Sequence, residues 1–333
     1  MVEVYDRRIF MNLAFAGFRH SHIIAFYKTA QSNRRVNITG SFENEAGVRE
    51  SVSRAHGISF TYDSYKDILD DKAVDAVAIG EYYSKRGSMI IDALRHGKHV
   101  ICDKPLCTTL EELEVIEGLA RENKLVVSCL LDLRYMPQVE RVKRMISENA
   151  IGRINIISFT AQHCLDFENR PSWYFEEGKH GGTINDIAIH GIDLIRYITG
   201  KELTKVDFAR TWNAFAQKAP GFKDCGHFAA ELEDISLIAD VSYAAPRFAG
   251  IMPTYWDFKL WGSEGMLSFN YAEPVIRVYK TLEITIDCDK CDIGILDAFI
   301  DEIAGKSTKM NTFDILQSQR QTLLIQNYAD EAR

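Results

Sequence analysis

Residues 11–22 read Met-Asn-Leu-Ala-Phe-Ala-Gly-Phe-Arg-His-Ser-His, and the fold prediction begins with them. A short apolar run ends in a glycine and is followed by a helical pattern, which is how a buried parallel strand passes into a helix. Similar short runs at 36–42, 58–61, 74–79, 99–102 and 125–129 alternate with amphipathic stretches. This alternation predicts an α/β domain over residues 1–131, with a Rossmann-like parallel sheet covered by helices on both faces.

The turn after the first run lies where a dinucleotide fingerprint G-x-G-x-x-G would fall, and only its first glycine is kept. Gly17 can make the tight turn, and the amides that begin the next helix can bind a pyrophosphate. Arg19 replaces the second glycine, so its guanidinium either contacts the cofactor or swings aside. An ordinary strand-to-helix turn is the alternative. The residues expected to contact a dinucleotide here are Gly17, Phe18, Arg19, His20, Ser21 and His22.

Glu43 follows the second run, 26 residues after Gly17, near the place where an acidic side chain binds the adenosine ribose hydroxyls. A carboxylate repels a 2′-phosphate, so the sequence favours NAD, with NADP as the alternative. Glu43 could instead only cap a helix that begins near Asn44.

Length, charge and cysteine content limit the class of protein. A chain of 333 residues predicts two domains, and a net charge of −8 does not favour nucleic acid or an anionic membrane as a partner. No long apolar run and no apolar leader is visible, so we expect a cytoplasmic protein. Seven cysteines suit free thiols, and the pair Cys288 and Cys291 lacks the two further ligands of a structural zinc site. No metal is expected.

Two motifs connect the sequence to a known family. Residues 93–106, Ala-Leu-Arg-His-Gly-Lys-His-Val-Ile-Cys-Asp-Lys-Pro-Leu, resemble the A-L-x-x-G-K-H-V-x-x-E-K-P-L motif of the Gfo/Idh/MocA oxidoreductases, with Asp103 in place of Glu and with Lys104 and Pro105 unchanged. Residues 181–193, Gly-Gly-Thr-Ile-Asn-Asp-Ile-Ala-Ile-His-Gly-Ile-Asp, resemble the family's G-G-G-x-x-x-D-x-G-x-H-x-x-D motif. The resemblance extends over nearly the whole chain.

The resemblance implies further features of the molecule. It implies a second, α+β domain over residues 132–333 with a largely antiparallel open sheet, through which the chain forms a homodimer or homotetramer. It implies that Lys104 reaches both nicotinamide and substrate, and that Asp103 and Pro105 lie beside the cofactor. The family's T-P-N-x-x-H reads here as Glu-Tyr-Tyr-Ser-Lys-Arg at 81–86. The aromatic pair Tyr82 and Tyr83 either packs on the nicotinamide side or consists only of loop residues.

The second motif places polar side chains at helical spacing. On a helix over about 183–199, Asp186, His190, Asp193 and Tyr197 share one face, opposite an apolar face. A solvent-exposed polar stripe is the alternative, and a His/Asp metal site is a third possibility that lacks further ligands. Alcohol oxidation needs a base, and His190 is suited to that role. Asp186 or Asp193 can orient the His190 ring or bind a neighbouring hydroxyl of the substrate. Lys104 can stabilise the alkoxide that forms on the substrate.

Two further residues are expected at the substrate. Arg134 lies in a stretch that resembles the family only weakly. Trp173 lies in a segment similar to a substrate loop of the family, where it either stacks on a sugar ring or simply packs in the core. The second domain is expected to hold strands at 154–163, 205–212, 233–242, 256–261, 265–270 and 275–279, with helices from about 293.

The sequence therefore predicts an NAD(P)-dependent oxidoreductase that transfers hydride between a nicotinamide and a hydroxyl or keto carbon of a sugar, cyclitol or related polyol. Two alternatives stay open at this point. One is a redox-neutral glycoside hydrolase or lyase that keeps NAD bound, and the other is a non-catalytic nicotinamide-binding regulator.

Overall fold

The computed structural model describes residues 10–247, 255–288 and 294–331. The chain divides into two compact units. The first unit comprises residues 1–107, 111–130 and 295–316, and the second comprises 108–110, 131–294 and 317–333. Residues 295–316, which lie in the sequence between two parts of the second unit, thus belong to the first.

The first unit contains the parallel sheet that the sequence predicts. Its strands are β1 (Met11–Ala16), β2 (Val36–Phe42), β3 (Ala76–Ile79), β4 (His99–Cys102) and β5 (Val127–Cys129). They follow the order β2-β1-β3-β4-β5, and every pairing is parallel. The predicted strand at 58–61 is wrong. That segment runs past the end of β2, where the N–H groups of Thr61 and Tyr62 both donate to the carbonyl of Ser41 instead of forming a ladder.

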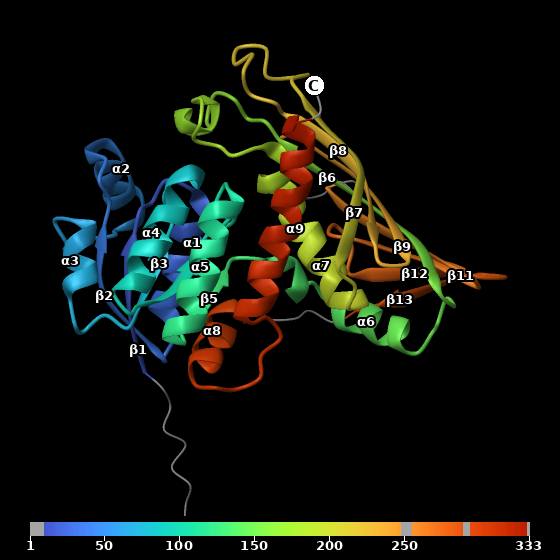
Figure 1. Cartoon of the computed structure of the whole chain (residues 1–333), viewed down its shortest axis with the longest axis horizontal. Coiled ribbons are helices and arrows are strands. Elements are labelled where there is room, and N and C mark those ends of the chain that lie inside the picture. Colours follow the sequence, from blue (N-terminus) through green and yellow to red (C-terminus); the bar gives the residue numbers. More distant parts are fainter. Residues whose placement is uncertain (1–9, 248–254, 289–293, 332–333) are drawn as a thin grey trace, which may run out of the picture. The chain divides into compact units, whose positions relative to one another are not determined.

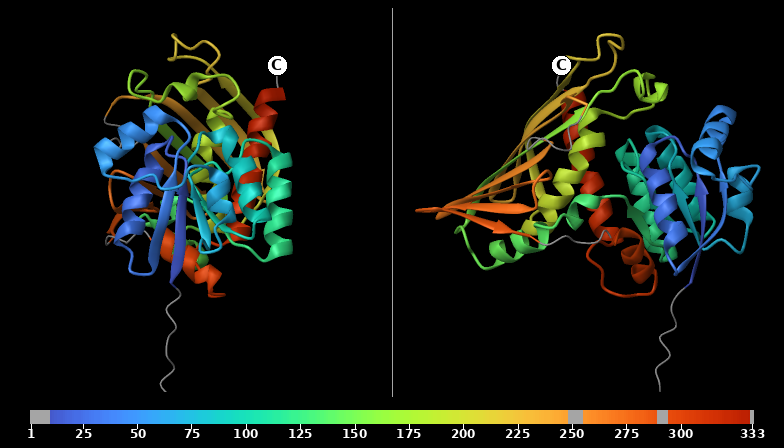
Figure 2. Two further views of the ribbon diagram at one scale, coloured as in Figure 1. Left: turned by 90° about the vertical axis from the view of Figure 1, so that its left-hand side faces the viewer. Right: turned by 180° about the vertical axis from the view of Figure 1, so that it is seen from behind.

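Helices cover both faces of this sheet. They are α1 (Ser21–Ser32), α2 (Ala46–His56), α3 (Tyr65–Asp70), α4 (Tyr83–Arg95) and α5 (Leu110–Asn123). Figures 1 and 2 show α4 and α5 on one face and α1 on the other. All four residues of β3 are buried, as expected of a strand with helices on both sides. α8 (Ile295–Ile303) is tied to the start of β2 by Arg35, whose guanidinium contacts Asp297 at 3.2 Å and Asp301 at 2.6 Å.

The second unit is built on an eight-stranded mixed sheet. Its strands are β6 (Ile154–Cys164), β7 (Leu203–Trp212), β8 (Cys225–Leu232), β9 (Ile235–Ala245), β10 (Trp256–Gly262), β11 (Gly265–Asn270), β12 (Val275–Tyr279) and β13 (Glu283–Asp287). The order is β13-β12-β11-β10-β6-β9-β8-β7, and β6 with β9 is the parallel pair. The largely antiparallel open sheet is confirmed, although β8 and β13 were not predicted.

One face of this sheet is covered and the other is open. The helical segments of the unit are η1 (Asp132–Tyr135), α6 (Val139–Ser147), η2 (Ser172–Phe175), η3 (Ile184–Ala188), α7 (Ile189–Thr199) and most of α9 (Thr312–Glu331). Figure 2 shows α6, α7 and α9 on the same side of the strands. β9 alternates accordingly, with Leu237, Ala239 and Val241 buried and Ser236 and Ile238 exposed.

Among the described residues, no helix has both the length and the apolar character needed to cross a membrane.

Candidate active site

The turn after β1 is shaped for close approach between backbone segments. Gly17 has φ +80°, and a Cβ there would lie 2.8 Å from the backbone nitrogen of Glu81, so only glycine fits without strain. Its N–H donates to the carbonyl of Phe42, and the N–H of Arg19 donates to the carbonyl of Gly80. The turn is therefore fixed between the ends of β2 and β3, at the carboxyl edge where open parallel sheets bind ligands.

The turn leads into a helix N-terminus that is suited to an anion. α1 has no acidic residue in its first turn, and its N-cap residue His20 makes no side-chain cap hydrogen bond. Backbone N–H groups at such an end carry a partial positive charge. These features make the first residues of α1 suited to an anionic group such as a phosphate, whereas the N–H groups of Gly17 and Phe18 are already bonded to Phe42 and Glu43.

Glu43 and Arg19 meet beside this turn. The Glu43 carboxylate is fully buried and accepts N–H bonds from Phe18 at 2.6 Å and from Glu45 at 2.9 Å. The Arg19 guanidinium lies 3.6 to 3.7 Å from carboxylate oxygens of Glu43, Glu45 and Glu81, and 5.9 Å from the ring centre of Tyr82. Burial, with a smaller contribution from Glu43, raises the pKa of Glu81. Glu43 is thus part of the loop itself, and Arg19 compensates the negative charge there.

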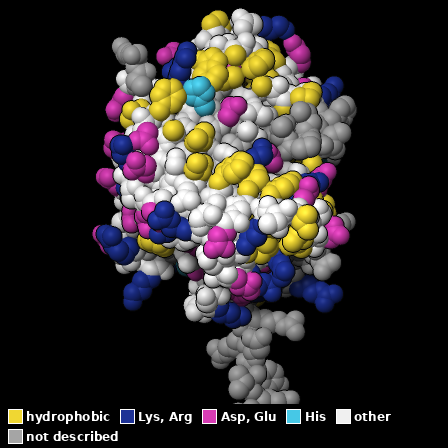
Figure 3. Space-filling model, turned by 90° about the vertical axis from the view of Figure 1, so that its right-hand side faces the viewer, with side chains coloured by type: hydrophobic (Ala, Val, Ile, Leu, Met, Phe, Trp, Pro, Cys, Tyr) yellow, Lys and Arg dark blue, Asp and Glu magenta, His cyan; other side chains and the backbone are white. Residues whose placement is uncertain are grey.

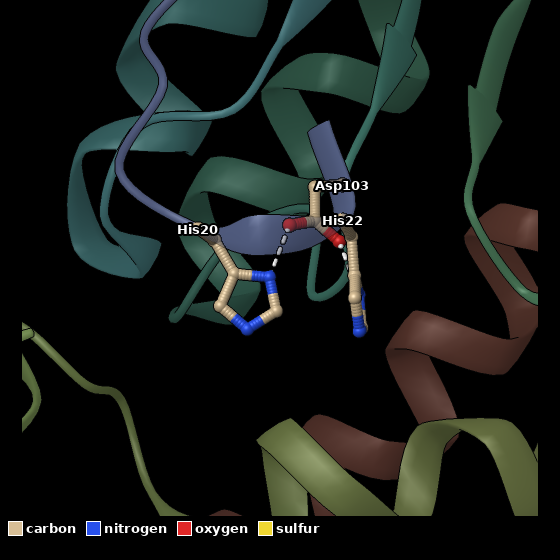
Figure 4. A group of neighbouring side chains, drawn as sticks. All are labelled: His20, His22 and Asp103. Carbon is tan, nitrogen blue, oxygen red and sulfur yellow. Dashed lines mark hydrogen bonds and ion pairs between the residues drawn. The ribbon is translucent and has the colours of Figure 1, made fainter. Parts of the chain in front are cut away.

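Asp103 joins two histidines at the end of β4 (Figure 4). The carboxylate contacts Nδ1 of His20 at 2.8 Å through Oδ2 and Nδ1 of His22 at 3.1 Å through Oδ1. Oδ2 also accepts a hydrogen bond from Arg86 at 3.1 Å, and Oδ1 accepts one from the N–H of Lys104 at 2.8 Å. The two carboxylate oxygens therefore receive nitrogen contacts from four residues.

The charge states of this group follow from its surroundings. Burial alone would raise the pKa of Asp103, but Arg86 and then the histidines outweigh it and hold the pKa well below its usual range. Burial lowers the pKa of His20 to about 4, against a smaller opposing effect of Asp103. An ionised Asp103 can only accept hydrogen bonds, so a neutral His20 must donate its proton from Nδ1, which leaves the lone pair on Nε2.

Arg86 lies at a position where the sequence departs from a family motif and contacts another such position, Asp103. It stands where the family has His, and Asp103 stands where the family has Glu. The fully buried guanidinium also donates from Nε to the carbonyl of Glu81, and from Nη1 to the carbonyls of Asp103, Lys104 and Pro105. The longer Arg86 side chain thus reaches the shorter acid and fixes the backbone that carries Lys104.

Lys104 is buried, with 4% exposure, and its ammonium lies 5.9 Å from the centre of the Tyr83 ring. The same ring packs against Arg86 at 4.6 Å and against His20 at 6.0 Å between centroids. Of the predicted aromatic pair Tyr82 and Tyr83, Tyr83 therefore lies among the residues that surround Lys104, while Tyr82 lies near Arg19.

In the second unit, Asp186 lies in η3, a turn of π-helix that precedes α7. It is 2% exposed and accepts a hydrogen bond from the hydroxyl of Tyr243. Nε2 of His180 lies 3.0 Å from that hydroxyl and 3.4 Å from Oδ2 of Asp186. Burial, and then Asp186, raise the pKa of Tyr243 well above its usual value, so Tyr243 is a neutral donor. The sequence did not predict the roles of His180 and Tyr243.

His190 lies one helical turn after Asp186 and is 6% exposed. Its Nδ1 is 3.5 Å from Oδ1 of Asp132, and its ring packs edge-on against Trp256 with centroids 5.7 Å apart. Asp132, from η1, therefore lies within ion-pair distance of His190, an acid that the sequence did not single out.

Asp193 has a different partner from the one expected. Arg134 donates to both of its oxygens at 2.7 Å, and Ser318 donates to Oδ1 at 2.8 Å. Arg134 is 1% exposed. The expected substrate residue Arg134 therefore lies in a buried bidentate ion pair that joins η1 to α7. The predicted apolar face of this helix is buried, and so is the polar face at Asp186, His190 and Asp193.

Trp173 is also buried, at 2% exposure, with its ring 4.2 Å from that of Tyr174. A cavity of about 680 Å³ in the second unit is lined by Tyr174, His180 and Thr211, among other residues, whereas Trp173 is not among the lining residues. The Thr211 hydroxyl is buried and has no hydrogen-bond partner among the described residues. The cavity thus reaches the hydrogen-bonded group of His180, Tyr243 and Asp186.

Comparison with known proteins gives the same division of the chain. Residues 13–130 match a family described as "Oxidoreductase family, NAD-binding Rossmann fold", and residues 139–268 match one described as "GFO/IDH/MocA C-terminal domain".

Curated relatives include levoglucosan dehydrogenase of Pseudarthrobacter phenanthrenivorans, 29% identical over 66% of this chain and 61% of that protein. Another is scyllo-inositol 2-dehydrogenase (NAD(+)) of Bacillus subtilis, 32% identical over 48% of this chain and 45% of that protein. The chain thus matches about half to three fifths of the length of these relatives.

Solved structures share the fold over nearly all of the chain. Levoglucosan dehydrogenase in complex with NADH and levoglucosan has a TM-score of 0.81 and 22% identity, covering 96% of this chain and 97% of that one. An oxidoreductase domain protein from Kribbella flavida has a TM-score of 0.81 and 18% identity, covering 97% and 98%.

Proposed function

Because the chain belongs to the GFO/IDH/MocA oxidoreductase family, we propose that it transfers hydride between NAD and a CH–OH or keto carbon of a sugar, cyclitol or related polyol. The observation that carries the proposal is the joint retention of Lys104 at the end of β4 and of Asp186 and His190 one helical turn apart. The names of the relatives, which act on levoglucosan and scyllo-inositol, support a polyhydroxylated substrate.

His190 is the proton acceptor in this proposal. A neutral imidazole can take the hydroxyl proton as hydride leaves the carbon. Asp132, 3.5 Å from Nδ1, stabilises the imidazolium that results. The buried Lys104 ammonium stabilises the alkoxide as charge develops on the substrate oxygen. The nicotinamide ring, when bound, supplies the hydride acceptor or donor.

Asp186 binds a neighbouring substrate hydroxyl. A carboxylate that already accepts from Tyr243 keeps further lone pairs for another donor, and polyols offer such donors. Arg134 and Trp173 are nearly inaccessible, so we assign them a positioning role. Arg134 holds α7 through Asp193, and Trp173 packs against the ring of its neighbour Tyr174 within η2.

The proposal includes NAD as the preferred cofactor and a homo-oligomer as the working form. The open face of the second unit's sheet supports the latter. Exposed Trp261, Ile156 and Ile238 lie on the adjoining strands β10, β6 and β9, with Trp261 opposite Ile156 in the register. Figure 3 shows apolar side chains gathered on one face of the molecule. Burying such a patch against a second copy would remove it from water.

NADH formation tests the function directly. The chain is mixed with NAD and, in turn, with levoglucosan, scyllo-inositol, D-xylose and other polyols, and NADH absorbance is followed. Net NADH formation with at least one polyol is expected. Consumption of a glycoside without net NADH would instead indicate the redox-neutral alternative, and NAD binding without any reaction across the panel would indicate a regulator.

A further inference from the structure

The first unit brings together three side chains that are all potential metal ligands: His20, His22 and Asp103. Their ligand atoms lie within 4.8 Å of one another, and among the described residues no other group of this kind occurs. The histidines come from the turn before α1 and from its first residues, and Asp103 follows β4. Figure 4 shows the two imidazole rings on either side of the carboxylate, each approaching it through Nδ1.

We propose that His20, His22 and Asp103 bind a divalent first-row transition metal ion, with Nδ1 of each imidazole and the carboxylate as ligands. Two imidazoles and one carboxylate suit zinc, cobalt(II), nickel and iron(II). Magnesium and calcium prefer oxygen ligands alone. The site therefore selects a transition metal, which the sequence analysis did not expect.

The spacing of the ligand atoms fits such an ion. The two Nδ1-to-oxygen distances are 2.8 and 3.1 Å. Metal bonds of about 2.0–2.2 Å place neighbouring ligand atoms roughly 3.0–3.5 Å apart at octahedral or tetrahedral angles. The two nitrogen-to-oxygen spacings are thus already close to those of neighbouring ligands on one ion, and all the ligand atoms lie within 4.8 Å of one another. Each neutral imidazole keeps one proton, which moves from Nδ1 to Nε2 when the metal takes the Nδ1 lone pair.

Neighbouring residues hold the Asp103 carboxylate in place, and one side of the site is open to ions from solvent. Asp103 is fixed by the N–H of Lys104 at 2.8 Å and by Arg86 at 3.1 Å, and such outer hydrogen bonds orient a metal ligand. The His22 side chain is 47% exposed, so an ion can reach the site from solvent. Water completes the coordination shell.

The positive charge of Arg86 repels a cation at this site and should lower the affinity for the metal ion. Because that guanidinium lies beside Asp103, we expect dissociation constants on the order of 1–100 µM, weaker than those of closed structural zinc sites. An ion bound here would tie the turn after β1 to the end of β4, next to Lys104.

The test is a titration of the purified full chain, without tag or dinucleotide, with zinc and cobalt(II). Calorimetry should give one equivalent, and cobalt(II) should develop visible absorption bands. His22→Ala should weaken binding at least tenfold with unchanged circular dichroism, since its side chain is half exposed, and His20→Ala should do the same.

Two control variants test the location. His96 faces Asp70 at 3.9 Å in a His–Asp pair outside this group, so His96→Ala should bind metal like the parent chain. The double variant Cys288→Ser, Cys291→Ser should also be unchanged. The proposal is overturned by the absence of saturable binding, by full affinity in the His20→Ala, His22→Ala double variant, or by loss of binding only in the cysteine variant. None of these outcomes involves hydride transfer, so the proposed function is tested separately.

Discussion

Glu43 illustrates how a single residue can serve both the fold and the cofactor. Its carboxylate accepts the N–H groups of Phe18 and Glu45, so it shapes the turn before it meets any ligand. Glu43 is not the cap of the following helix, because the N-cap residue of α2 is Glu45, whose own N–H donates to Glu43. The carboxylate's charge beside this turn makes the turn unfavourable for a 2′-phosphate.

We therefore expect NAD to bind at least tenfold more tightly than NADP, because a second phosphate near Glu43 and Glu45 adds like-charge repulsion of about 1–2 kcal/mol. Calorimetric titration with both cofactors measures this difference. Arg19→Ala is the informative companion variant, since it removes the guanidinium nearest both acids and should widen the preference. Equal or tighter binding of NADP would contradict the expectation.

His20 predicts a pH dependence of stability. Its pKa of about 4 in the folded chain lies below the ordinary value of 6.5, so the unfolded chain binds more protons between those values. The contribution of His20 to the free energy of unfolding is therefore fully present above pH 6.5. About 3 kcal/mol of it is lost as the pH falls to 4.

Urea unfolding at several pH values between 7 and 4 measures this effect. The free energy of unfolding should fall more steeply with decreasing pH in the parent chain than in His20→Asn, while exposed His96→Asn should follow the parent. Parallel curves for the parent and His20→Asn would show that His20 is not held neutral by burial.

The sequence indicated the role of a residue where that residue belongs to a motif. It did not indicate hydrogen-bond or ion-pair partners that come from distant segments of the chain. Asp186 and His190 are buried on adjacent helical turns, at the spacing that the motif implied. Tyr243 lies 57 residues from Asp186, and Asp132 comes from a different element from His190, so neither contact leaves a local pattern. His180 directly precedes the Gly181-Gly182 motif, and this position was the one feature of the sequence that pointed to His180.

At the scale of elements, α7 depends on a close approach between helix and sheet. A Cβ on Gly191 would lie 2.6 Å from the Phe159 ring of β6, so this glycine sets how closely the helix packs. Gly118 of α5 offers a matched comparison, because a Cβ there would meet no atom within 4 Å.

We expect Gly191→Ala to lower the free energy of unfolding by about 1–3 kcal/mol through overpacking, and to displace His190 beside it. Gly118→Ala should raise stability by about 0.5–1 kcal/mol, because alanine favours the helix and nothing obstructs it. Chemical denaturation of both variants tests the pair. A stabilised Gly191→Ala would mean that the helix does not pack against Phe159 as described.

The sequence predicted best the strands of the first sheet, because a strand covered by helices on both faces needs a continuous apolar run. Three strands of the first sheet have the predicted bounds, and β3 and β5 were found within two residues. β8 was missed because Cys-Gly-His-Phe-Ala-Ala-Glu-Leu has low strand propensity, and its pairing with β7 and β9 decides its conformation. The π-turn at η3 has no sequence pattern of its own.

At the scale of the whole molecule, the open sheet face predicts assembly. If Trp261, Ile156 and Ile238 lie in an interface between copies, Ile238→Lys should shift the chain toward monomer in analytical ultracentrifugation. Phe313→Lys, at an exposed apolar residue on α9, serves as the control and should leave the assembly unchanged. A parent chain that sediments as a monomer, or an Ile238→Lys variant with the parent's assembly, would contradict this.

The central claim is that Lys104 and His190 carry the chemistry while other residues hold the dinucleotide. Each acts on charge that develops only during the reaction, so removing either should slow hydride transfer by roughly 10² to 10⁴. We propose that NAD binds at the turn after β1 and at the start of α1, which neither substitution alters.

Single-turnover kinetics of Lys104→Met and His190→Ala with the best polyol, beside NAD titrations of both variants, test this claim most directly. We predict a large loss of the hydride-transfer rate in each variant, with NAD affinity within a few-fold of the parent. Hydride transfer at the parent rate in either variant would contradict the assignment, and loss of NAD affinity alone would make that residue a cofactor ligand instead.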